Sequence, residues 1–366
     1  MTGQIVHEWI ERHGGSENVL EQIAREFPEA RIQCLWNNSG ERFDTERVDE
    51  TWLARTPLRN SKSLALPFMP FTWRTLRDSN AEWVLCSSHL FAHHARFRGE
   101  AKHARKYVYV HSPARYIWAP DMDARGANPL IRAAALPLKA LDRFRAREAT
   151  AIASNSNFVR ERVARTWRRD STVIYPPVDV AQYTDSIHDS DLTEQELELL
   201  SSLPDSFILG ASRFIPYKRL DLVIRMGQVN KVPVVLAGDG PSLVELQALA
   251  AQSPGLVTFV GRPSFPLLRA LYERALAYVF PAVEDFGIMP VEAMATGTPV
   301  VAPMMGGAAE SVLEGRTGTL LEKFDDATMR GAINRVSALH ASDCIERAWE
   351  FDTSVFRRRI REWVER

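Results

Sequence analysis

Short apolar runs alternate with polar, helix-forming stretches along most of the chain. In the first half, the runs that we predict as strands are Gln4–Ile10, Arg31–Trp36, Trp83–Ser87, Lys106–His111 and Ala149–Ala153. In the second half, they are Phe207–Ser212, Val232–Ala237, Leu256–Val260, Ala275–Phe280 and Thr298–Ala302. A strand–loop–helix order that repeats in this way is typical of parallel sheets with helices on both faces. The pattern predicts an α/β protein with two Rossmann-like domains that face each other across a cleft.

A proline pair marks the expected junction between the two domains. Pro176 and Pro177 interrupt the segment Val173–Asp179, and neither residue suits a helix interior or a central strand. With 366 residues the chain is also long for a single domain. We therefore expect an N-terminal domain over 1–175, a second domain over 176–350, and a C-terminal helix within 351–366 that packs back on the first domain.

Three further segments have a predicted local structure. The stretch Asn18–Phe27 reads as a helix after a tight turn, and Glu41–Ser79 reads as irregular. The last helix, from about Ser354 to Arg366, is charged throughout, and its expected apolar stripe consists of Val355, Ile360 and Val364.

Composition and charge describe an ordinary globular protein. The chain is 45% hydrophobic and 25% charged with a formal net charge of −1, so nothing in it suggests a nucleic-acid partner. Its three cysteines have no CxxC spacing, which favours a reduced, cytoplasmic compartment and no structural zinc. The polar N-terminus does not resemble a signal peptide, and no apolar run approaches the roughly 20 residues that span a bilayer. We expect a soluble protein or one peripheral to a membrane.

Positive charge is concentrated in one segment. Arg125–Arg169 contains eleven basic and three acidic residues. Within it, Pro129–Leu141 is apolar apart from single basic residues. Such a segment suits docking on an anionic lipid surface at the inner face of the membrane. The alternative is a solvated helical face without a partner.

The segment Pro281–Pro299 carries the clearest chemical signal. It places Glu284 on the loop after the strand Ala275–Phe280, and Glu292 in the first turn of a short helix that has Pro290 in that same turn and stops at Gly297. Two carboxylates that flank free backbone N–H groups suit a polyhydroxyl ligand that carries a phosphate. For Glu292 the alternative is a side chain that only stabilises the helix N-terminus.

Cations and glycines follow other strands of the second domain. Arg213 comes after the strand Phe207–Ser212, and Lys218 comes one loop later, a pattern that suits a diphosphate. The alternative is a set of structural ion pairs, for instance between Arg219 and Asp221. Gly238 begins a Gly-Asp-Gly-Pro turn after the next strand and gives the backbone room beside a ligand. Taken alone, that turn is weak evidence.

Together these residues resemble family 4 retaining glycosyltransferases of the GT-B fold, most closely the mannosyltransferase-like branch. The motifs that carry the resemblance extend over nearly the whole chain in a consistent order: Gly14-Gly15, Tyr109–Trp118, Ala153–Phe158, Ile174–Asp179, Ser212–Lys218, Ala237–Pro241 and the Glu284–Glu292 element. A member of this family is expected to take a nucleoside-diphosphate sugar as co-substrate, without a cofactor, and to work in polysaccharide biosynthesis.

The resemblance also implies roles for individual residues. In the second domain, Arg213 and Lys218 would neutralise the leaving diphosphate, and Glu284 would bind hydroxyl groups of the donor sugar. Further donor contacts would come from Phe286, Gly287, Ile288 and Glu292, the last on the ribose, and from Gly238, Gly261 and Arg262. In the first domain, Gly14 and Gly15 would let the backbone approach the phosphates, and His111 would face the donor sugar as a catalytic residue.

No metal ligand set is predicted. Asp121-Met-Asp123 has the form of a DxD motif, but it follows Trp118-Ala-Pro120 in a stretch that reads as a loop. Fixed cations and a helix N-terminus are sufficient to stabilise a departing diphosphate without a metal. Retention of configuration follows from the resemblance alone.

Several alternatives stay open at this stage. A nucleotide-sugar 2-epimerase shares the architecture but needs no acceptor, and a non-catalytic sugar-nucleotide-binding partner is a third class. A dinucleotide-dependent oxidoreductase is disfavoured, because no GxGxxG follows the first strand. The form of the motifs favours GDP-mannose as donor, with UDP-sugars as the alternative, and a glycan or polyprenyl-linked acceptor.

Overall fold

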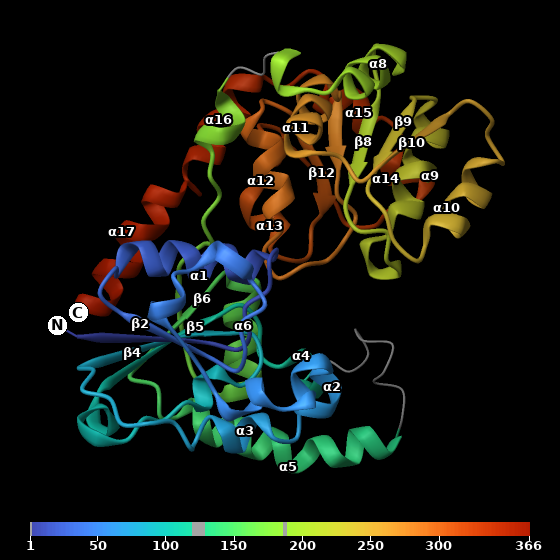
Figure 1. The fold of residues 1–366 in the computed structure, drawn as a ribbon. Coiled ribbons are helices and arrows are strands. Elements are labelled where there is room, and N and C mark those ends of the chain that lie inside the picture. The colour runs from blue at the N-terminus through green and yellow to red at the C-terminus, as the bar shows by residue number, and fades with distance from the viewer. Residues whose placement is uncertain (1, 119–128, 186–188) are drawn as a thin grey trace. The chain divides into compact units, whose positions relative to one another are not determined.

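The computed structural model describes residues 2–118, 129–185 and 189–366. The chain divides into two compact units, of which the first comprises Met1–Pro177 with Ser354–Arg366 and the second comprises Val178–Thr353. Each unit is built on one parallel sheet with helices on both of its faces (Figure 1). This arrangement confirms the predicted class of two parallel-sheet α/β domains.

The sheet of the first unit has seven strands in the order β3-β2-β1-β4-β5-β6-β7, and neighbouring strands are parallel. The strands are β1 (Gly3–His7), β2 (Arg31–Cys34), β3 (Val48–Glu50), β4 (Trp83–Ser88), β5 (Arg105–Val110), β6 (Ala151–Ser154) and β7 (Thr172–Val173). The helices are α1 (Gly15–Glu26), α2 (Lys62–Ala65), α3 (Met69–Thr72), α4 (Arg115–Trp118), α5 (Pro129–Ala146), α6 (Asn157–Trp167) and α17 (Thr353–Glu365).

Alternating side chains of this sheet belong to two separate cores. On β5, Val108 and Val110 pack in a cluster with Trp73 and Trp167, whereas Tyr107 and Tyr109 belong to the cluster on the other face. Successive residues of a strand point to opposite faces, so an almost continuous apolar run fits a sheet that is covered on both sides. The carboxyl ends of these strands are therefore held between two packed layers.

The C-terminal helix α17 belongs to the first unit. Its buried side chains are Phe356, Ile360, Trp363 and Val364, and they join the same core as Tyr107 and Tyr109. The stripe that we predicted included Val355, but Phe356 is the buried residue because the face that meets the core runs through positions 356, 360, 363 and 364. Glu26 of α1 accepts hydrogen bonds from Arg357 (2.8 Å) and Arg361 and fixes the helix from the side.

The sheet of the second unit has six parallel strands in the order β10-β9-β8-β11-β12-β13. The strands are β8 (Ile208–Ala211), β9 (Val234–Ala237), β10 (Val257–Gly261), β11 (Ala277–Val279), β12 (Val300–Pro303) and β13 (Gly318–Leu321). The helices are α7 (Ala181–Thr184), α8 (Glu194–Ser202), α9 (Leu220–Asn230), α10 (Leu243–Ala250), α11 (Phe265–Arg274), α12 (Ile288–Ala295), α13 (Ala308–Ser311), α14 (Asp326–Met329), α15 (Ala332–Val336) and α16 (Ala341–Trp349).

Some local predictions are wrong in detail. The segment 41–79 is not irregular throughout, since it contains β3, α2, α3 and several 3-10 turns. Helix α1 begins at Gly15 and not at Asn18, so both glycines of the first motif lie at its N-terminus. The strands β3, β7 and β13 were not predicted, because edge strands of two to four residues leave too short a pattern to recognise.

None of the helices in the described part of the chain is long and apolar enough to cross a membrane.

Candidate functional site

The loop between β11 and α12 carries the predicted carboxylate Glu284. Strand β11 ends at Val279, and α12 begins at Ile288 directly after Gly287, which adopts a left-handed conformation (φ 88°). Such a conformation favours glycine, because a side chain at that position is strained. Since the helix begins at Ile288, Pro290 lies in its first turn as predicted, but Glu292 lies in the second turn and not in the first.

Lys218 and Glu284 form an ion pair within this unit. Lys218 ends the 3-10 turn η9 (Pro216–Lys218) and is only 9% exposed, while its ammonium lies 5.5 Å from the ring centroid of Tyr217 and 5.6 Å from that of Phe280. The cation predicted to meet a diphosphate and the carboxylate predicted to bind a sugar are therefore neighbours. Their charges compensate each other beside two aromatic rings, in surroundings where an unpaired charge is costly.

The other predicted cation, Arg213, has a different environment. It follows β8 on an exposed loop and, among the residues that the structure describes, takes part in no ion pair. The loop is fixed on either side of it, because Ser212 donates to the carbonyl of Ala237 (3.1 Å) and Phe214 to that of Asp239 (2.8 Å). Arg219 pairs with Asp221, which is the structural alternative considered from the sequence, so this arginine is already engaged. Arg213 therefore combines a fixed backbone with a free guanidinium.

Glycines allow the loops to approach one another closely. At Gly238 (φ 140°) a Cβ would lie 1.9 Å from the carbonyl oxygen of Ser212, and at Gly240 (φ 154°) it would lie 2.5 Å from that of Phe214. The loop that carries Arg213 thus rests directly on this glycine turn. Gly238 was predicted to leave room for the backbone to approach a ligand. In the structure, the loop that carries Arg213 lies in this room.

Gly261 and Arg262 lie farther along the sheet. Gly261 is the last residue of β10 and Arg262 follows it; β10 is an edge strand, which is separated from β11 by β9 and β8. Both residues are exposed, and Gly261 accepts a hydrogen bond from the backbone N–H of Gly238 (2.5 Å). The predicted donor residues therefore form a series along the carboxyl edge of one sheet, from Arg262 at the outer strand to Glu284 near the centre.

Glu292 is enclosed by tyrosine side chains that the sequence did not single out. The Tyr272 hydroxyl donates to Glu292 Oε2 (3.2 Å), and burial raises the pKa of this carboxyl, while hydrogen bonds from Tyr183 and Tyr272 oppose the rise. The two tyrosines come from α7 and α11, far from Glu292 in the sequence, so no local pattern connected them. Glu292 is thus a buried acceptor held in place by hydroxyl groups.

A second glycine turn, also missed, supports the Glu284 loop. Gly307 lies after β12, and its backbone N–H donates to the carbonyl of Glu284 (2.8 Å). A Cβ at Gly307 would lie 2.3 Å from both the Asp285 carbonyl oxygen and the Phe286 Cα. The signal was present in the sequence as a double glycine, Gly306-Gly307, shortly after a predicted strand.

In the first unit, His111 directly follows β5 and lies in a group of three histidines. Its Nε2 is 2.8 Å from Ser87 Oγ, and its ring centroid is 6.4 Å from that of His7 and 6.2 Å from that of His89. Burial and the neighbouring imidazoles hold the pKa of His111 well below its usual range. The residue is therefore a neutral imidazole at neutral pH.

Glu8 fixes the loop that follows β4. Its carboxylate is fully buried and accepts backbone hydrogen bonds from Leu90 and Ala92, each at 2.8 Å. Burial alone would raise its pKa, but the pKa is lowered, because the neighbouring imidazoles of His89 and His7 and, after them, these hydrogen bonds outweigh the cost of burial. A buried anion with several N–H partners holds the carboxyl ends of β1 and β4 in a fixed relation.

The predicted glycines Gly14 and Gly15 lie at the start of α1, and the side chain of Glu17 covers this end of the helix. Glu17 accepts hydrogen bonds from Ser16 Oγ (2.8 Å) and from the backbone of Glu11 (3.3 Å), and it is almost fully buried. A Cβ at Gly14 would lie 2.0 Å from its Oε2. The protein's own carboxylate therefore lies against the helix N-terminus at which a phosphate was predicted, where negative charge is favourable.

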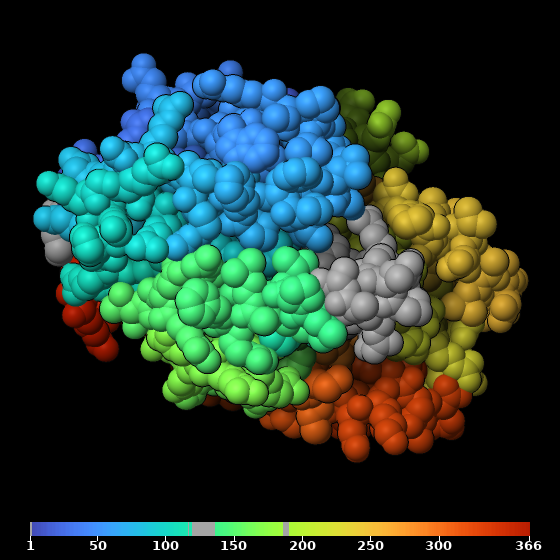
Figure 2. Space-filling model, turned by 90° about the horizontal axis from the view of Figure 1, so that it is seen from below, coloured from blue at the N-terminus to red at the C-terminus, as the bar shows by residue number. Residues whose placement is uncertain are grey.

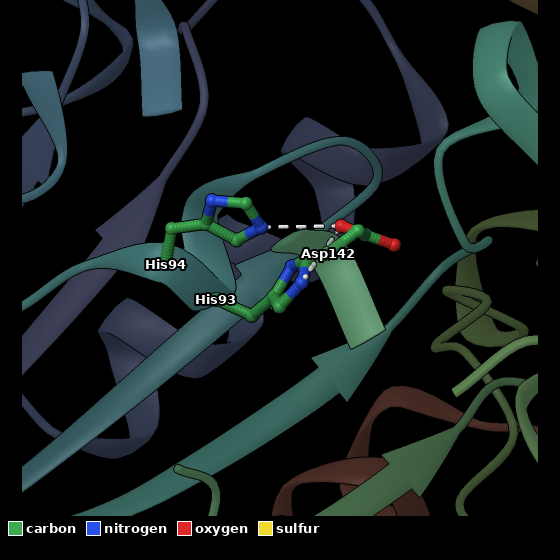
Figure 3. A group of neighbouring side chains, drawn as sticks. All are labelled: His93, His94 and Asp142. Carbon is green, nitrogen blue, oxygen red and sulfur yellow. Dashed lines mark hydrogen bonds and ion pairs between the residues drawn. The ribbon is translucent and has the colours of Figure 1, made fainter. Parts of the chain in front are cut away.

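One group of side chains in the described residues has the ligand types and spacing of a metal site. His93, His94 and Asp142 offer atoms that lie within 4.8 Å of one another, and all three side chains are buried (Figure 3). Both imidazole Nε2 atoms lie near Asp142 Oδ1, at 3.1 and 3.2 Å, while Oδ2 accepts from the indoles of Trp118 (2.7 Å) and Trp167 (2.6 Å). Hydrogen bonds occupy both oxygens of Asp142, so the group serves to anchor α5 against its neighbours.

The basic segment is largely engaged within the fold. Arg143 donates to the carbonyl of Thr166 (2.8 Å), Arg160 pairs with Asp170, and Arg162 donates to Ser112 (2.9 Å). Arg125, where the predicted segment begins, lies outside the described residues, as does Asp121-Met-Asp123. The charge excess of this segment therefore overstates the free positive charge on α5 and α6.

Among the described residues, each unit exposes six large apolar side chains, and those of the first unit lie on or beside its helices and 3-10 turns. They are Trp52, Leu64, Phe68, Phe71, Leu136 and Phe144. Figure 2 shows the surface of α2 and α3 in light blue next to that of α5 in green, on one face of the unit. Apolar side chains exposed on adjoining elements suit contact with a partner or a membrane surface.

Two sequence families match adjacent parts of the chain. Residues 13–182 match the family described as "Glycosyltransferase Family 4", and residues 193–349 match "Glycosyl transferases group 1". The boundary between the two matches falls close to the boundary between the two structural units.

Individual relatives are similar over part of their length. The D-inositol 3-phosphate glycosyltransferase of Mycobacterium avium is 31% identical over 220 residues, which cover 52% of this chain and 50% of the relative. The GDP-mannose-dependent alpha-(1-6)-phosphatidylinositol monomannoside mannosyltransferase of Mycolicibacterium smegmatis is 32% identical over 36% of this chain and 38% of its own. Alpha-1,3/1,6-mannosyltransferase alg-2 of Neurospora crassa is 29% identical over 48% and 46%. The chain spans about half the length of these relatives, or less.

Solved structures are similar over the full chain. Anabaena Alr3699/HepE, crystallised in complex with UDP, superposes with a TM-score of 0.72 at 19% identity and full coverage of both chains. Sucrose-phosphate synthase from Thermosynechococcus elongatus gives a TM-score of 0.70 at 16% identity, with 100% of this chain and 98% of the other covered. At these identities the similarity shows a shared fold.

Proposed function

Because this chain belongs to the family 4 glycosyltransferases and has their GT-B fold, we propose that it transfers mannose from GDP-mannose to a glycan or lipid-linked acceptor with retention of configuration. The observation that carries this proposal is the pairing of Lys218 with Glu284 at the carboxyl edge of the second sheet. A cation for the leaving phosphate and a carboxylate for sugar hydroxyls are the two groups that a nucleotide sugar requires side by side.

The chemistry follows from the charges that develop in the reaction. Cleavage of the anomeric C–O bond leaves positive charge on the sugar and negative charge on the diphosphate. Arg213 and Lys218 stabilise the diphosphate, and the positive end of α12 adds to that stabilisation. In this proposal Glu284 binds sugar hydroxyls, and Glu292, held by its tyrosines, binds the ribose. The reaction needs no metal in this scheme, because two fixed cations supply the charge.

The acceptor hydroxyl loses its proton as it attacks. We propose a front-face route, in which the acceptor approaches on the side from which the diphosphate leaves and a phosphate oxygen takes the proton. In this route the new bond forms on the same face as the broken one, so the configuration is retained. His111, as a neutral imidazole of the first unit, supplies a hydrogen bond to the donor sugar and takes no charge.

The donor is proposed as GDP-mannose because two relatives carry mannosyltransferase names, one of them GDP-mannose-dependent. UDP-sugars are the alternative donors, since Anabaena Alr3699/HepE was crystallised with UDP and with UDP-glucose. That similarity concerns the fold alone, so the choice between nucleotides is left to a direct measurement.

A lipid-linked acceptor would bring the protein to the cytoplasmic face of a membrane. The support for this part is the set of exposed apolar side chains on and beside α2, α3 and α5. The discriminating variant is Phe71→Ser combined with Phe144→Ser, because both side chains are more than half exposed and their loss leaves the core intact. Flotation with vesicles of anionic lipid should fall for this variant, and unchanged flotation would remove the membrane from the proposal.

A donor screen tests the proposed function directly. Purified protein is incubated with GDP-mannose, UDP-glucose or UDP-N-acetylglucosamine, each with and without membrane lipid extract, and the released nucleotide is measured. We expect GDP release that depends on the extract. Conversion of the sugar in donor alone would indicate a 2-epimerase, UDP release would reassign the donor, and no release under any condition would count against a transferase.

A further inference from the structure

A serine connects two histidines at the carboxyl edge of the first sheet. Ser87 Oγ lies 2.8 Å from His111 Nε2 and 3.1 Å from His7 Nδ1. His7 and Ser87 are buried without exposed surface, and His111 is partly buried. The three side chains therefore form a hydrogen-bonded series that leads from the two fully buried residues to His111.

The strand register fixes the positions of these three side chains. His7 is the last residue of β1 and pairs with Ser87 of β4, and Ser87 in turn pairs with Tyr109 of β5. His111 follows two residues later, so its side chain points to the same side of the sheet as that of Tyr109. Because its backbone N–H also donates to the carbonyl of Ser88 (2.9 Å), the residue is held at both its backbone and its ring.

The direction of the two hydrogen bonds follows from the surroundings of the His7 ring. A serine hydroxyl donates one hydrogen bond, so it donates either to His111 or to His7. If it donated to His7 Nδ1, the Nε2 of His7 would carry a proton, yet within the described residues that buried atom has no hydrogen-bond partner. A buried N–H without an acceptor is rarer than an unpaired acceptor. The favoured order is therefore His7 Nδ1–H to Ser87, and Ser87 O–H to His111 Nε2.

We propose that Ser87 and His7 are positioning residues that keep His111 in the Nδ1–H form, with that N–H available to an oxygen of the donor sugar. The inference rests on the proposed function, in which His111 contacts the donor. A free imidazole can rotate and exchange its proton between two nitrogens, whereas this one presents a single donor in a fixed direction. Preorganised donors of this kind stabilise a transition state without reorganisation at the moment of reaction.

The same strand offers a matched control. Ser88 is also fully buried, but it faces the opposite side of the sheet, and its Oγ lies 3.1 Å from His93 Nδ1. Ser87→Ala and Ser88→Ala therefore remove the same atom from adjacent residues, but only Ser87→Ala removes a hydrogen bond to His111. Thermal unfolding of both variants monitors any general loss of stability.

A spectroscopic measurement tests the inference without any turnover. Long-range nitrogen–proton correlation spectra of histidine-labelled protein report which ring nitrogen carries the proton, and the His111 signals are assigned by their loss in His111→Gln. We expect His111 protonated at Nδ1 in the wild type and in Ser88→Ala, and a loss of that single form in Ser87→Ala. A His111 protonated at Nε2 in the wild type, or unchanged signals in Ser87→Ala, would overturn the inference.

Kinetics with the donor found in the screen then test the positioning role. We expect kcat of Ser87→Ala to fall about tenfold, the effect of one well-placed hydrogen bond, with KM nearly unchanged and Ser88→Ala close to the wild type. Ser87→Cys, which keeps a weak donor, should be intermediate, and it replaces Ser87→Ala if that variant does not fold. A changed protonation pattern with unchanged kcat would contradict the role. If no donor is turned over by the wild type, the proposed function fails, and the spectra still decide whether the chain of hydrogen bonds exists.

Discussion

Lys218 and Glu284 form an ion pair although 66 positions separate them in the sequence. The pair forms because η9 and the loop after β11 both follow neighbouring strands, β8 and β11, whose carboxyl ends meet at one edge of the sheet. Opposite charges that hold each other in place keep both groups extended toward that edge. A bound donor can then exchange this internal contact for contacts with its phosphate and its hydroxyl groups.

Removal of both partners of this pair should cost less stability than the sum of the two single removals. Lys218→Met or Glu284→Gln leaves a largely buried group without its partner, and each should lower the free energy of unfolding by about 1–2 kcal/mol. The double variant should lose less than the sum of the two, because residues in contact are coupled. Denaturant unfolding measures all three values.

The control for this cycle is Arg219→Ala, which breaks the exposed ion pair with Asp221 and should change stability by no more than about 0.5 kcal/mol. Transfer activity should fall by about 100-fold or more in both single variants, because one lacks the cation for the leaving diphosphate and the other the carboxylate that binds the donor sugar. Additive stability effects in the cycle, or an active Glu284→Gln, would contradict the role of the pair.

Gly307 should be sensitive to the smallest possible side chain. In Gly307→Ala the new methyl group would lie 2.3 Å from Asp285 and Phe286, and the loop that carries Glu284 would have to move. We expect donor binding, measured by calorimetry with the nucleoside diphosphate, to weaken at least tenfold, since a displaced loop forfeits at least about 1.4 kcal/mol.

Gly255→Ala is the informative comparison for this variant. Gly255 has φ +78°, and a Cβ there has no atom within 4 Å, so the substitution adds backbone strain without a clash. It should cost about 1 kcal/mol of stability and leave donor binding unchanged. Equal binding by Gly307→Ala and the wild type would show that the turn does not support the donor loop.

The sequence alone was sufficient to predict the two-sheet architecture and the position of single functional residues on their loops. Both sheets were predicted from buried runs such as Lys106–His111, because central strands of a parallel sheet are apolar on both faces. Glu284 was placed correctly on the loop after its strand, because Gly287 and Pro290 are local signals for a turn and a helix start.

What the sequence did not reveal depends on residues that meet only in the folded chain. Tyr183 and Tyr272 reach Glu292 from two other helices, and Glu17 folds back over Gly14. Edge strands such as β7, with two residues, have too few positions to show a period. Pro290 lies in the first turn of α12 as predicted, but Glu292 lies one turn later than predicted, because the helix begins directly after Gly287.

Glu292 should make stability depend on pH in a specific direction. Burial raises the pKa of this carboxyl in the folded protein, so the unfolded chain releases its proton at lower pH than the folded one. The contribution of Glu292 to stability is therefore greatest below its unfolded pKa and is lost as the pH rises through the folded value. In Glu292→Gln, which has no carboxyl group to titrate, this decrease of stability with rising pH should be absent.

The measurement is the unfolding free energy of wild type and Glu292→Gln between pH 4 and pH 8. The difference between the two proteins should shift in favour of the glutamine variant as the pH rises. Tyr272→Phe removes one hydrogen bond from the carboxylate and should enlarge the pH effect, because the charged form loses a partner. A difference that is constant with pH would show that Glu292 is not the titrating group.

Asp142 should give the opposite pH dependence in the first unit. Its pKa is held well below the usual range, because the nearby imidazoles of His93 and His94 outweigh the cost of burial. The stability that it contributes is present above its unfolded pKa and is lost as the pH falls toward the folded value.

Asp142→Asn, which keeps one carbonyl oxygen for the indole donors, should be less stable than the wild type at pH 7, with the deficit shrinking toward pH 3. Near-ultraviolet circular dichroism during acid titration reports this step, because Trp118 and Trp167 donate to the same carboxylate. A deficit that stays the same between pH 7 and pH 3 would mean that the aspartate contributes through its shape and not through its charge.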